Sequence, residues 1–187
     1  YSKDLGSAAA PTAGLHFTQE LLAQISAIGV ELAFVTLHVG LDTFRPVQDE
    51  DPTNHQIHTE YFHISQDAAE AINNAKEEGR RVIAVGTTSV RVLEYAAQVK
   101  ADGDMSQIAQ STGQADLFIL PGYRFRTVDA LITNFHLPRS TLLMLVSAFA
   151  EADTSTSSGR DMVLAAYAEA IQQKYRFYSF GDGMLVL

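Results

Sequence analysis

Residues 128–150 read VDALITNFHLPRSTLLMLVSAFA, an apolar run followed by a polar loop and a second apolar run. The pattern predicts a buried strand over 128–133 and a helix that begins at Ser140. Residues 81–99, RVIAVGTTSVRVLEYAAQV, repeat this order, with a strand over 81–85, the turn GTTS and a helix over 90–99. Two strand–loop–helix units predict an α/β fold, here a layered αβα arrangement around a mostly parallel sheet.

The other elements are expected to complete these layers. Further helices are predicted over 18–29, 65–79 and 159–175, and further strands over 30–40 and 116–120. In the first of these helices Leu21, Leu22, Ile25 and Ile28 share one face, and strand 30–40 is apolar enough to be covered on both faces. We expect residues 41–63 and 100–114 to be loops and residues 175–187 to form a hairpin-like pair.

Composition limits the function classes. The chain has 187 residues, 47% of them hydrophobic, and a net charge of −9. A chain of this size can bury roughly 70% of its surface, so it needs no disulfide or metal to stabilise the fold. The hydrophobic fraction and the charged fraction of 19% are those of globular domains, which excludes intrinsic disorder. With no cysteine, disulfide scaffolds, thiolate zinc sites and cysteine nucleophiles are excluded. The negative charge argues against general nucleic-acid affinity, so a polyanion would have to meet a local basic face.

The first residues and the hydropathy of the sequence indicate whether it is a piece of a longer chain and in which compartment it acts. The first residues, YSKDLGSAAAP, include neither an initiator Met nor a basic-then-apolar signal pattern, so we expect a piece of a longer chain. No apolar run approaches the roughly 18 residues of a membrane span. Together with the absence of cysteine, this predicts a cytoplasmic protein.

In a parallel sheet, ligands bind beyond the carboxyl ends of the strands. The loops to inspect therefore follow Val39, Val85, Leu120 and Thr133. The turn GTTS, residues 86–89, offers backbone N–H groups and three hydroxyls at a helix N-terminus, as an anion or ribose site would. The alternative is a helix cap made by Thr87 or Ser89. Neither a Walker lysine nor a GxGxxG pattern is present.

The loop NFHLPRST, residues 134–141, gathers an amide, an imidazole, a guanidinium and two hydroxyls. Apolar neighbours on both sides of His136 predict a partly dry surrounding in which the imidazole can act as acid or base. A purely structural His136 is the alternative. Arg124, Arg126 and Arg139 flank this loop and are either ordinary surface charges or an edge that contacts phosphate.

A third cluster of titratable residues, HQIHTEYFH, spans residues 55–63. On a strand His58 and Glu60 share a face, whereas His55 and His63 point the other way. The spacing matches neither HExxH nor a zinc-finger pair, so no metal site is predicted. We interpret His58 and Glu60 as a pair for hydrogen bonding or proton transfer.

Several long strings, taken in order, resemble one known family. They are APTAGLHFT (10–18), LHVGLDTFRPV (37–47), HTEYF (58–62), RVIAVGTTSVRVLE (81–94), LFILPGYRFRTVDALITNFHLPRSTLLMLVSAF (117–149) and YRFYSFGDGMLVL (175–187). They resemble the S-adenosylmethionine:tRNA ribosyltransferase-isomerases of queuosine biosynthesis. Members of that family are nearly twice as long and carry an N-terminal portion with a small β-barrel domain. The resemblance implies that residues 1–187 form an α/β catalytic domain that is incomplete at its N-terminal side, and that they turn over poorly alone.

The resemblance also implies the reaction. The ribosyl moiety of S-adenosylmethionine passes to 7-aminomethyl-7-deazaguanine at the wobble position of tRNA, which yields epoxyqueuosine and releases adenine and methionine. S-adenosylmethionine is then a substrate, and no cofactor or metal is expected. Such a reaction needs a base for the ribose methylene beside the sulfonium, donors that assist the departure of adenine, and a neutral amine close by.

Residue type and loop position give each candidate an expected role. We expect His136 to be the acid/base residue, with Glu60, His58 and Asp182 as further catalytic candidates. The hydroxyls of the GTTS turn are expected to hold ribose or the methionine carboxylate, histidines to line the cleft, aromatic rings to stack on a base, and arginines to bind carboxylate or phosphate. The substrate-binding candidates are His16, Phe17, His38, Phe44, Arg45, Thr87, Thr88, Ser89, Arg91, Tyr123, Asn134, Arg139 and Ser140.

Two other classes of function remain open at this point. One is a small-molecule hydrolase that uses His/Glu acid–base pairs. The other is a non-catalytic binding module, which the acidic net charge permits.

Overall fold

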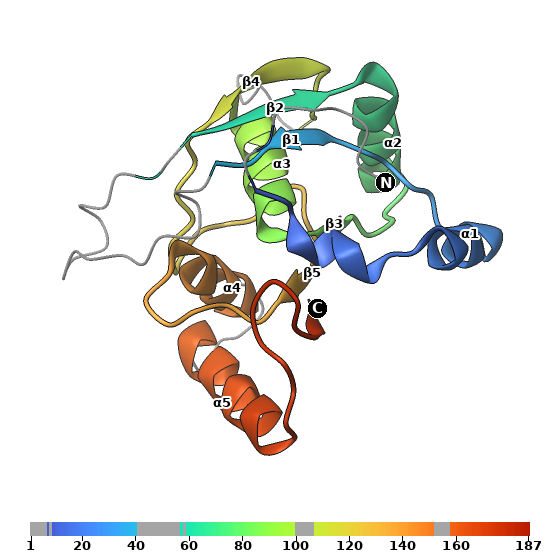
Figure 1. Cartoon of the computed structure of the whole chain (residues 1–187). Coiled ribbons are helices and arrows are strands. Elements are labelled where there is room, and N and C mark those ends of the chain that lie inside the picture. The colour runs from blue at the N-terminus through green and yellow to red at the C-terminus, as the bar shows by residue number, and fades with distance from the viewer. Residues whose placement is uncertain (1–6, 8, 41–56, 58, 100–106, 152–157) are drawn as a thin grey trace.

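The computed structural model describes residues 7, 9–40, 57, 59–99, 107–151 and 158–187 (Figure 1). Helices and strands are interspersed along these ranges, which confirms the α/β class. In chain order the elements are η1 (a 3-10 helix, Thr12–His16), α1 (Gln19–Ala27), β1 (Thr36–His38), β2 (Glu60–Ile64), α2 (Gln66–Glu77), β3 (Ile83–Val85), α3 (Thr87–Val99), β4 (Ser111–Ala115), β5 (Ala130–Asn134), α4 (Thr141–Glu151), α5 (Gly159–Gln172) and β6 (Gly183–Val186).

The strands form two small sheets, so the prediction of one mostly parallel sheet is wrong. One sheet has the order β1-β2-β4 and is antiparallel throughout. The other has the order β3-β5-β6, where β3 and β5 are parallel and β6 is antiparallel to β5. Among the described strands, β3 and β5 make the one parallel pair, and helix α3 lies on the connection between them.

Helix α3 lies between the two sheets and carries the centre of the core (Figure 1). Its side chains Val90 and Val92 are fully buried, and they join Phe62 of β2 and Leu131 of β5 in one apolar cluster. Instead of a single sheet between two helical layers, a helix thus fills the space between two sheets. The buried α3 places the carboxyl ends of β3 and β5 at one edge of the core.

Helix α1 stands at the periphery of the molecule (Figure 1). The apolar face predicted for this helix does not pack into the core, since no α1 side chain is buried and Leu21 remains exposed. The predicted strand 30–40 shortens to β1, and Val30, Leu32 and Phe34 before it are exposed rather than covered. A run of apolar residues therefore lies on the surface between α1 and β1.

Two segments that the sequence predicts to be loops contain strands. Residues 60–64 belong to β2, and the polar residues 111–115 make β4, which pairs with β2 from Glu60↔Ala115 to Ile64↔Ser111. The more apolar residues 116–120 lie outside any strand. The predicted hairpin over 175–187 is also wrong, since β6 pairs with β5 instead of with residues 175–180. In each case the choice of partner strand is non-local, and hydropathy does not encode it.

The local signals at helix starts are confirmed. The hydroxyl oxygens of Thr18, Ser65 and Ser140 each accept a hydrogen bond from the backbone N–H three residues on, at 3.2 Å. Helix α3 begins at Thr87, three residues earlier than predicted. None of the helices within the described ranges is long and apolar enough to cross a membrane.

Candidate functional site

The ends of β3 and β5 meet the short helix η1. Three segments far apart in the sequence converge here, and they enclose a small cavity of about 30 Å³. This volume suits about one or two waters. The convergence confirms two of the four predicted loops as neighbours, those after Val85 and Thr133. The lining residues are Pro11, Thr12, Ala13, Gly86, Thr87, Thr88, Thr133, Asn134, His136 and Leu142.

Asn134 ties β5 to η1. It is 4% exposed, and its Oδ1 accepts a hydrogen bond from the hydroxyl of Thr12 at 3.1 Å. Its amide Nδ2 lies 3.2 Å from Nε2 of His16, to which it donates. Both polar ends of the buried amide are therefore used, and together they position His16 at the edge of the cavity.

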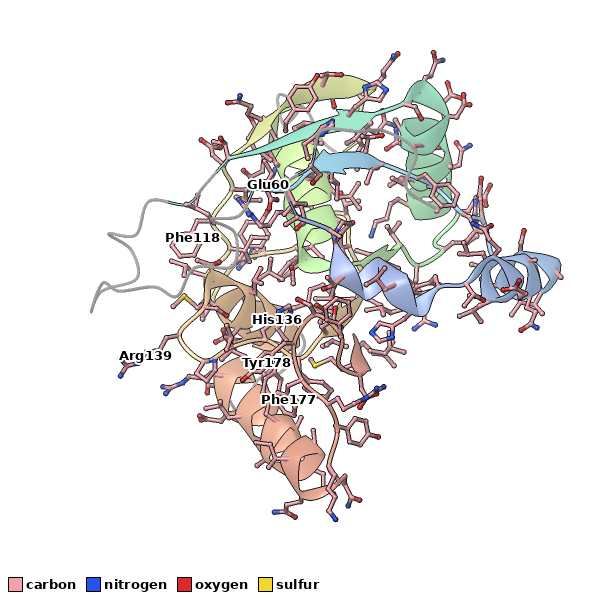
Figure 2. All side chains as sticks on the ribbon, in the orientation of Figure 1. Glu60, Phe118, His136, Arg139, Phe177 and Tyr178 are labelled. Atoms are coloured by element: carbon pink, nitrogen blue, oxygen red, sulfur yellow. The ribbon has the colours of Figure 1, made fainter. Side chains whose placement is uncertain are left out.

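His136 lies in the loop after β5, close to α4 and to the C-terminal segment (Figure 2). Its Nε2 is 2.8 Å from the hydroxyl of Thr133, and its backbone N–H donates to the hydroxyl of Tyr167 at 2.9 Å. Burial lowers the pKa of His136 from 6.5 to about 4, because the protonated ring would lose its hydration. The imidazole is therefore neutral at pH 7, as a residue that accepts a proton must be.

The turn GTTS contributes two buried hydroxyls to the same cavity. Thr87 and Thr88 are each 6% exposed and open helix α3. Gly86 has a φ of +94°, which only glycine adopts without strain, and it directs the chain from β3 into the helix. Ser89 donates to the carbonyl of Val85 at 2.8 Å, so its hydroxyl joins helix to strand instead of capping the helix. The expected hydroxyl cluster is thus formed by Thr87 and Thr88.

A second, larger pocket of about 210 Å³ adjoins the first and shares Thr12 with it. It is lined by Thr12, Leu15, His16, Arg176, Ser179, Phe180 and Gly181. His16, a predicted cleft residue, lines this pocket and not the cavity of His136, Thr87 and Thr88. Thr12, Arg176 and Phe180 were not predicted. The run YRFYSFGDG, with four aromatic residues beside two glycines, was the available signal.

Glu60 and Arg91 lie apart from the two pockets. Glu60 is fully buried on β2, and its Oε2 is 3.3 Å from the NH1 atom of Arg91, itself 4% exposed. Figure 2 shows Glu60 beside the upper sheet, apart from His136. Burial lowers the pKa of Arg91, and Glu60 opposes this effect. The two residues form a buried ion pair between β2 and α3, and neither lines the strand-end pockets.

Two further candidates are held by internal bonds. The Tyr123 hydroxyl donates to Glu94 at 3.2 Å and accepts from Gln98 at 3.0 Å, and burial together with Glu94 raises its pKa to about 12. Asp182 accepts from the backbone N–H of Arg176 at 2.7 Å and from its guanidinium at 3.1 Å. These bonds lower the pKa of Asp182, which closes the turn beside the larger pocket.

The polar side chains of the loop before α4 lie in different surroundings. Ser140 donates to the Leu137 carbonyl at 2.8 Å and caps α4, so its hydroxyl serves the loop itself. Arg139 is exposed, has a φ of 54°, and extends away from His136 into solvent (Figure 2). Of the loop NFHLPRST, Asn134 and His136 reach the cavity.

The remaining candidate site residues are Phe17, His38, His58, Phe44 and Arg45. Phe17 follows η1 and is partly buried, and His38 of β1 packs against the ring of Tyr61 with centroids 5.3 Å apart. His58, Phe44 and Arg45 lie outside the described residues. Within the described ranges no group of three or more His, Asp or Glu side chains is arranged to hold a metal ion. His63 instead contacts the hydroxyl of Thr112 at 2.8 Å.

Comparison with known proteins gives one consistent result. Three curated proteins named S-adenosylmethionine:tRNA ribosyltransferase-isomerase, from Symbiobacterium thermophilum, Carboxydothermus hydrogenoformans and Clostridioides difficile, are each 57% identical to all of this chain. The chain spans 51% of the length of each. A crystal structure of S-adenosylmethionine tRNA ribosyltransferase from Thermotoga maritima matches 94% of this chain and 51% of that one, with 42% identity and a TM-score of 0.71.

The family described as queuosine biosynthesis protein matches residues 1–186, nearly the whole sequence. The match includes η1, both strand-end loops and the C-terminal turn that form the two pockets. The chain belongs to this queuosine biosynthesis family.

Proposed function

We propose that the complete protein, meaning these 187 residues with any further part of the polypeptide, is a tRNA-modifying transferase. It moves the ribosyl moiety of S-adenosylmethionine to 7-aminomethyl-7-deazaguanine at the wobble position, which forms epoxyqueuosine and releases adenine and methionine. The proposal is supported by 57% identity, over all of this chain, to proteins named for this ribosyl transfer. Residues 1–187 would be the α/β part of the catalytic domain, acting in the cytoplasm.

The observation that carries the proposal at the level of chemistry is the neutral His136 next to Thr87, Thr88 and Asn134. The first step of such a transfer removes a proton from the ribose methylene beside the sulfonium, whose charge makes that carbon acidic. A neutral, partly buried imidazole can accept this proton without first losing one of its own. A substrate that displaces the contact between Thr133 and Nε2 would meet that nitrogen directly.

The buried hydroxyls supply the second requirement, which is orientation. Thr87 and Thr88 lie at the N-terminus of α3, where helix N–H groups and the helix dipole favour a carboxylate or a polar ribose edge. We assign them to the ribose hydroxyls or to the methionine carboxylate. Holding both reactants in one geometry can remove roughly 7–11 kcal/mol from a barrier, so these residues matter even without acting on a proton.

Binding of tRNA requires a local cationic surface, since the net charge of −9 repels a polyanion at long range. Arg139 and Arg176 are exposed, and Arg176 lines the larger pocket. We propose that they meet tRNA phosphates, which would position the RNA without reading its sequence. Arg91 is not assigned this role, because it is buried against Glu60.

The competing classes find less support. A hydrolase with a His/Glu pair would need a glutamate near His136, and Glu60 instead pairs with Arg91 near the other sheet. A non-catalytic binding module is less supported because the chain is 57% identical to proteins named as transferases.

The test is a single-turnover reaction of the complete protein with S-adenosylmethionine and tRNA that carries the aminomethyl precursor. We expect free adenine and epoxyqueuosine to form in equal amounts, measured by liquid chromatography and mass spectrometry. Matched tRNA that already carries epoxyqueuosine is the control and should release no adenine. Consumption of S-adenosylmethionine without tRNA would favour a hydrolase, and binding of either partner without any product would favour a binding module.

A further inference from the structure

The larger pocket combines one exposed aromatic ring with polar side chains. Phe180 is 86% exposed, the most exposed of the large hydrophobic residues in the described part of the chain. Around it lie Thr12, His16 and Arg176, which together offer a hydroxyl, an imidazole and a guanidinium. The pocket volume of about 210 Å³ is seven times that of the neighbouring cavity of about 30 Å³, so it admits a ring-sized group.

The turn that carries Phe180 is held closed. Asp182 accepts from the N–H of Arg176 at 2.7 Å, and its own N–H donates to the Arg176 carbonyl at 2.8 Å. Gly181 donates to the Tyr178 carbonyl at 3.0 Å, and a side chain at Gly181 would collide with the carbonyl of Arg176. These bonds fix the turn from both ends, and Phe180 is presented by a rigid loop.

The same turn contains unfavourable backbone geometry. Tyr178 has a φ of 68°, a left-handed conformation that is uncommon for a bulky residue. Its N–H donates to the carbonyl of Phe135 at 3.0 Å, which anchors the turn to the loop of His136. Figure 2 shows Tyr178 and Phe177 beside His136. Strain that is retained in this way is typical of functional sites.

Phe177 packs against other aromatic rings, whereas Phe180 is exposed to solvent. Phe177 packs into the core, with its ring centroid 4.7 Å from that of Phe135 and 5.6 Å from that of Tyr167. This contact already secures the turn, so Phe180 is not needed to hold it. A phenyl ring left in water beside a polar pocket is suited to stack on a flat, hydrogen-bonding partner.

We infer that Phe180 is the stacking platform for a heteroaromatic base in the pocket of Thr12, His16 and Arg176. The inference rests on the proposed function, which supplies two such bases, the adenine of S-adenosylmethionine and the deazaguanine of the tRNA. Both share the chemistry the pocket recognises, a planar fused ring with polar edges. Phe180 is thus a substrate-binding residue, and the experiment separates the two sources of the base.

The experiment compares Phe180→Ala, Phe180→Trp and wild type in the complete protein. Calorimetry gives the Kd for S-adenosylmethionine, and fluorescence anisotropy gives the Kd for precursor tRNA. Loss of one stacked base weakens binding by about 5- to 150-fold. We expect Phe180→Ala to show this loss for one of the two ligands, and Phe180→Trp to retain affinity. The ligand that is affected identifies the base.

Tyr175→Ala is the matched control, because Tyr175 is an exposed aromatic residue of the same segment that does not line the pocket. It should leave both Kd values within about twofold. The inference is overturned if Phe180→Ala also leaves both unchanged, or if it lowers the melting temperature with no change in Kd, since the ring would then pack against another part of the chain. A wild-type protein that binds neither ligand refutes the proposed function itself.

Discussion

The side-chain amide of Asn134 lies 3.2 Å from Nε2 of His16 and connects the end of β5 to η1, across 118 positions of sequence. The same amide accepts from Thr12 at 3.1 Å, so one buried residue holds both ends of the short helix. The two pockets share this helix as a common wall. The position of His16 therefore depends on β5 rather than on its neighbours in sequence.

Asn134→Ala should lower both stability and activity of the complete protein. It leaves the partners of a buried amide unsatisfied, which costs about 1–3 kcal/mol of unfolding free energy, and it releases η1 from the site. Urea unfolding and single-turnover kinetics measure the two effects. Asn73→Ala is the control, because Asn73 makes a similar pair of bonds to Ile108, at 2.8 and 2.9 Å, away from both pockets. It should reduce stability and leave turnover intact at a temperature where the protein is folded.

Acid should destabilise the protein through His136. Its folded pKa of about 4 is below its unfolded value of 6.5, so the unfolded chain binds the extra proton between these pH values. Stability contributed by the neutral ring is complete above pH 6.5 and falls as pH drops toward 4, by on the order of 3 kcal/mol. His136→Gln can keep a hydrogen bond to Thr133 but does not titrate. Unfolding free energies from pH 7 to 4.5 should fall less steeply for this variant, and parallel curves would contradict the prediction.

His136→Ala should slow the transfer by about a hundredfold or more, since loss of a general base costs roughly 10²–10⁴ in rate. The melting temperature should move by only a few degrees, because the ring is partly buried and the backbone bond to Tyr167 remains. His63→Ala is the matched control, a histidine on β2 whose contact is the hydroxyl of Thr112. If turnover of His136→Ala stays near normal, the proton acceptor is to be sought at His16.

The pair of Glu60 and Arg91 should act on stability and not on chemistry. Arg91→Ala leaves a buried carboxylate without its countercharge, which costs about 3–5 kcal/mol. Arg80→Ala removes solvent-exposed ion pairs with Glu31 and Glu78, which water screens, so it should change stability far less than Arg91→Ala. Thermal unfolding of the complete protein measures both. Single-turnover rates of folded Arg91→Ala that fall as far as those of His136→Ala would assign the pair a catalytic role.

Sequence patterns predicted the parts of the site that depend on local order. His136, Asn134, Thr87 and Thr88 were identified because they follow apolar strands, and the structure brings them together at the ends of β3 and β5. The helix starts at Thr18, Ser65 and Ser140 follow from residue type. At each start a Ser or Thr hydroxyl accepts a hydrogen bond from the backbone N–H three residues later.

The parts that were missed depend on strand partners. Phe180 and Arg176 reach the site because β6 pairs antiparallel with β5, and nothing in the hydropathy of residues 183–186 specifies that partner. The place of Glu60 depends on strand pairing in the same way. Its position opposite Ala115 on a central strand buries it beside Arg91, and hydropathy does not encode that contact.

The bare surface of α1 has a consequence for hydrogen exchange. Nine residues, Gln19–Ala27, are too few for a helix that is stable in water by itself, and no side chain of this one is buried. Its amide hydrogens should therefore exchange with deuterium almost as fast as those of a free peptide in the 187-residue chain, while those of buried α3 exchange through global unfolding. Any contact that covers α1 in the complete protein will slow this exchange. The exchange rate of α1 therefore measures whether this helix is covered.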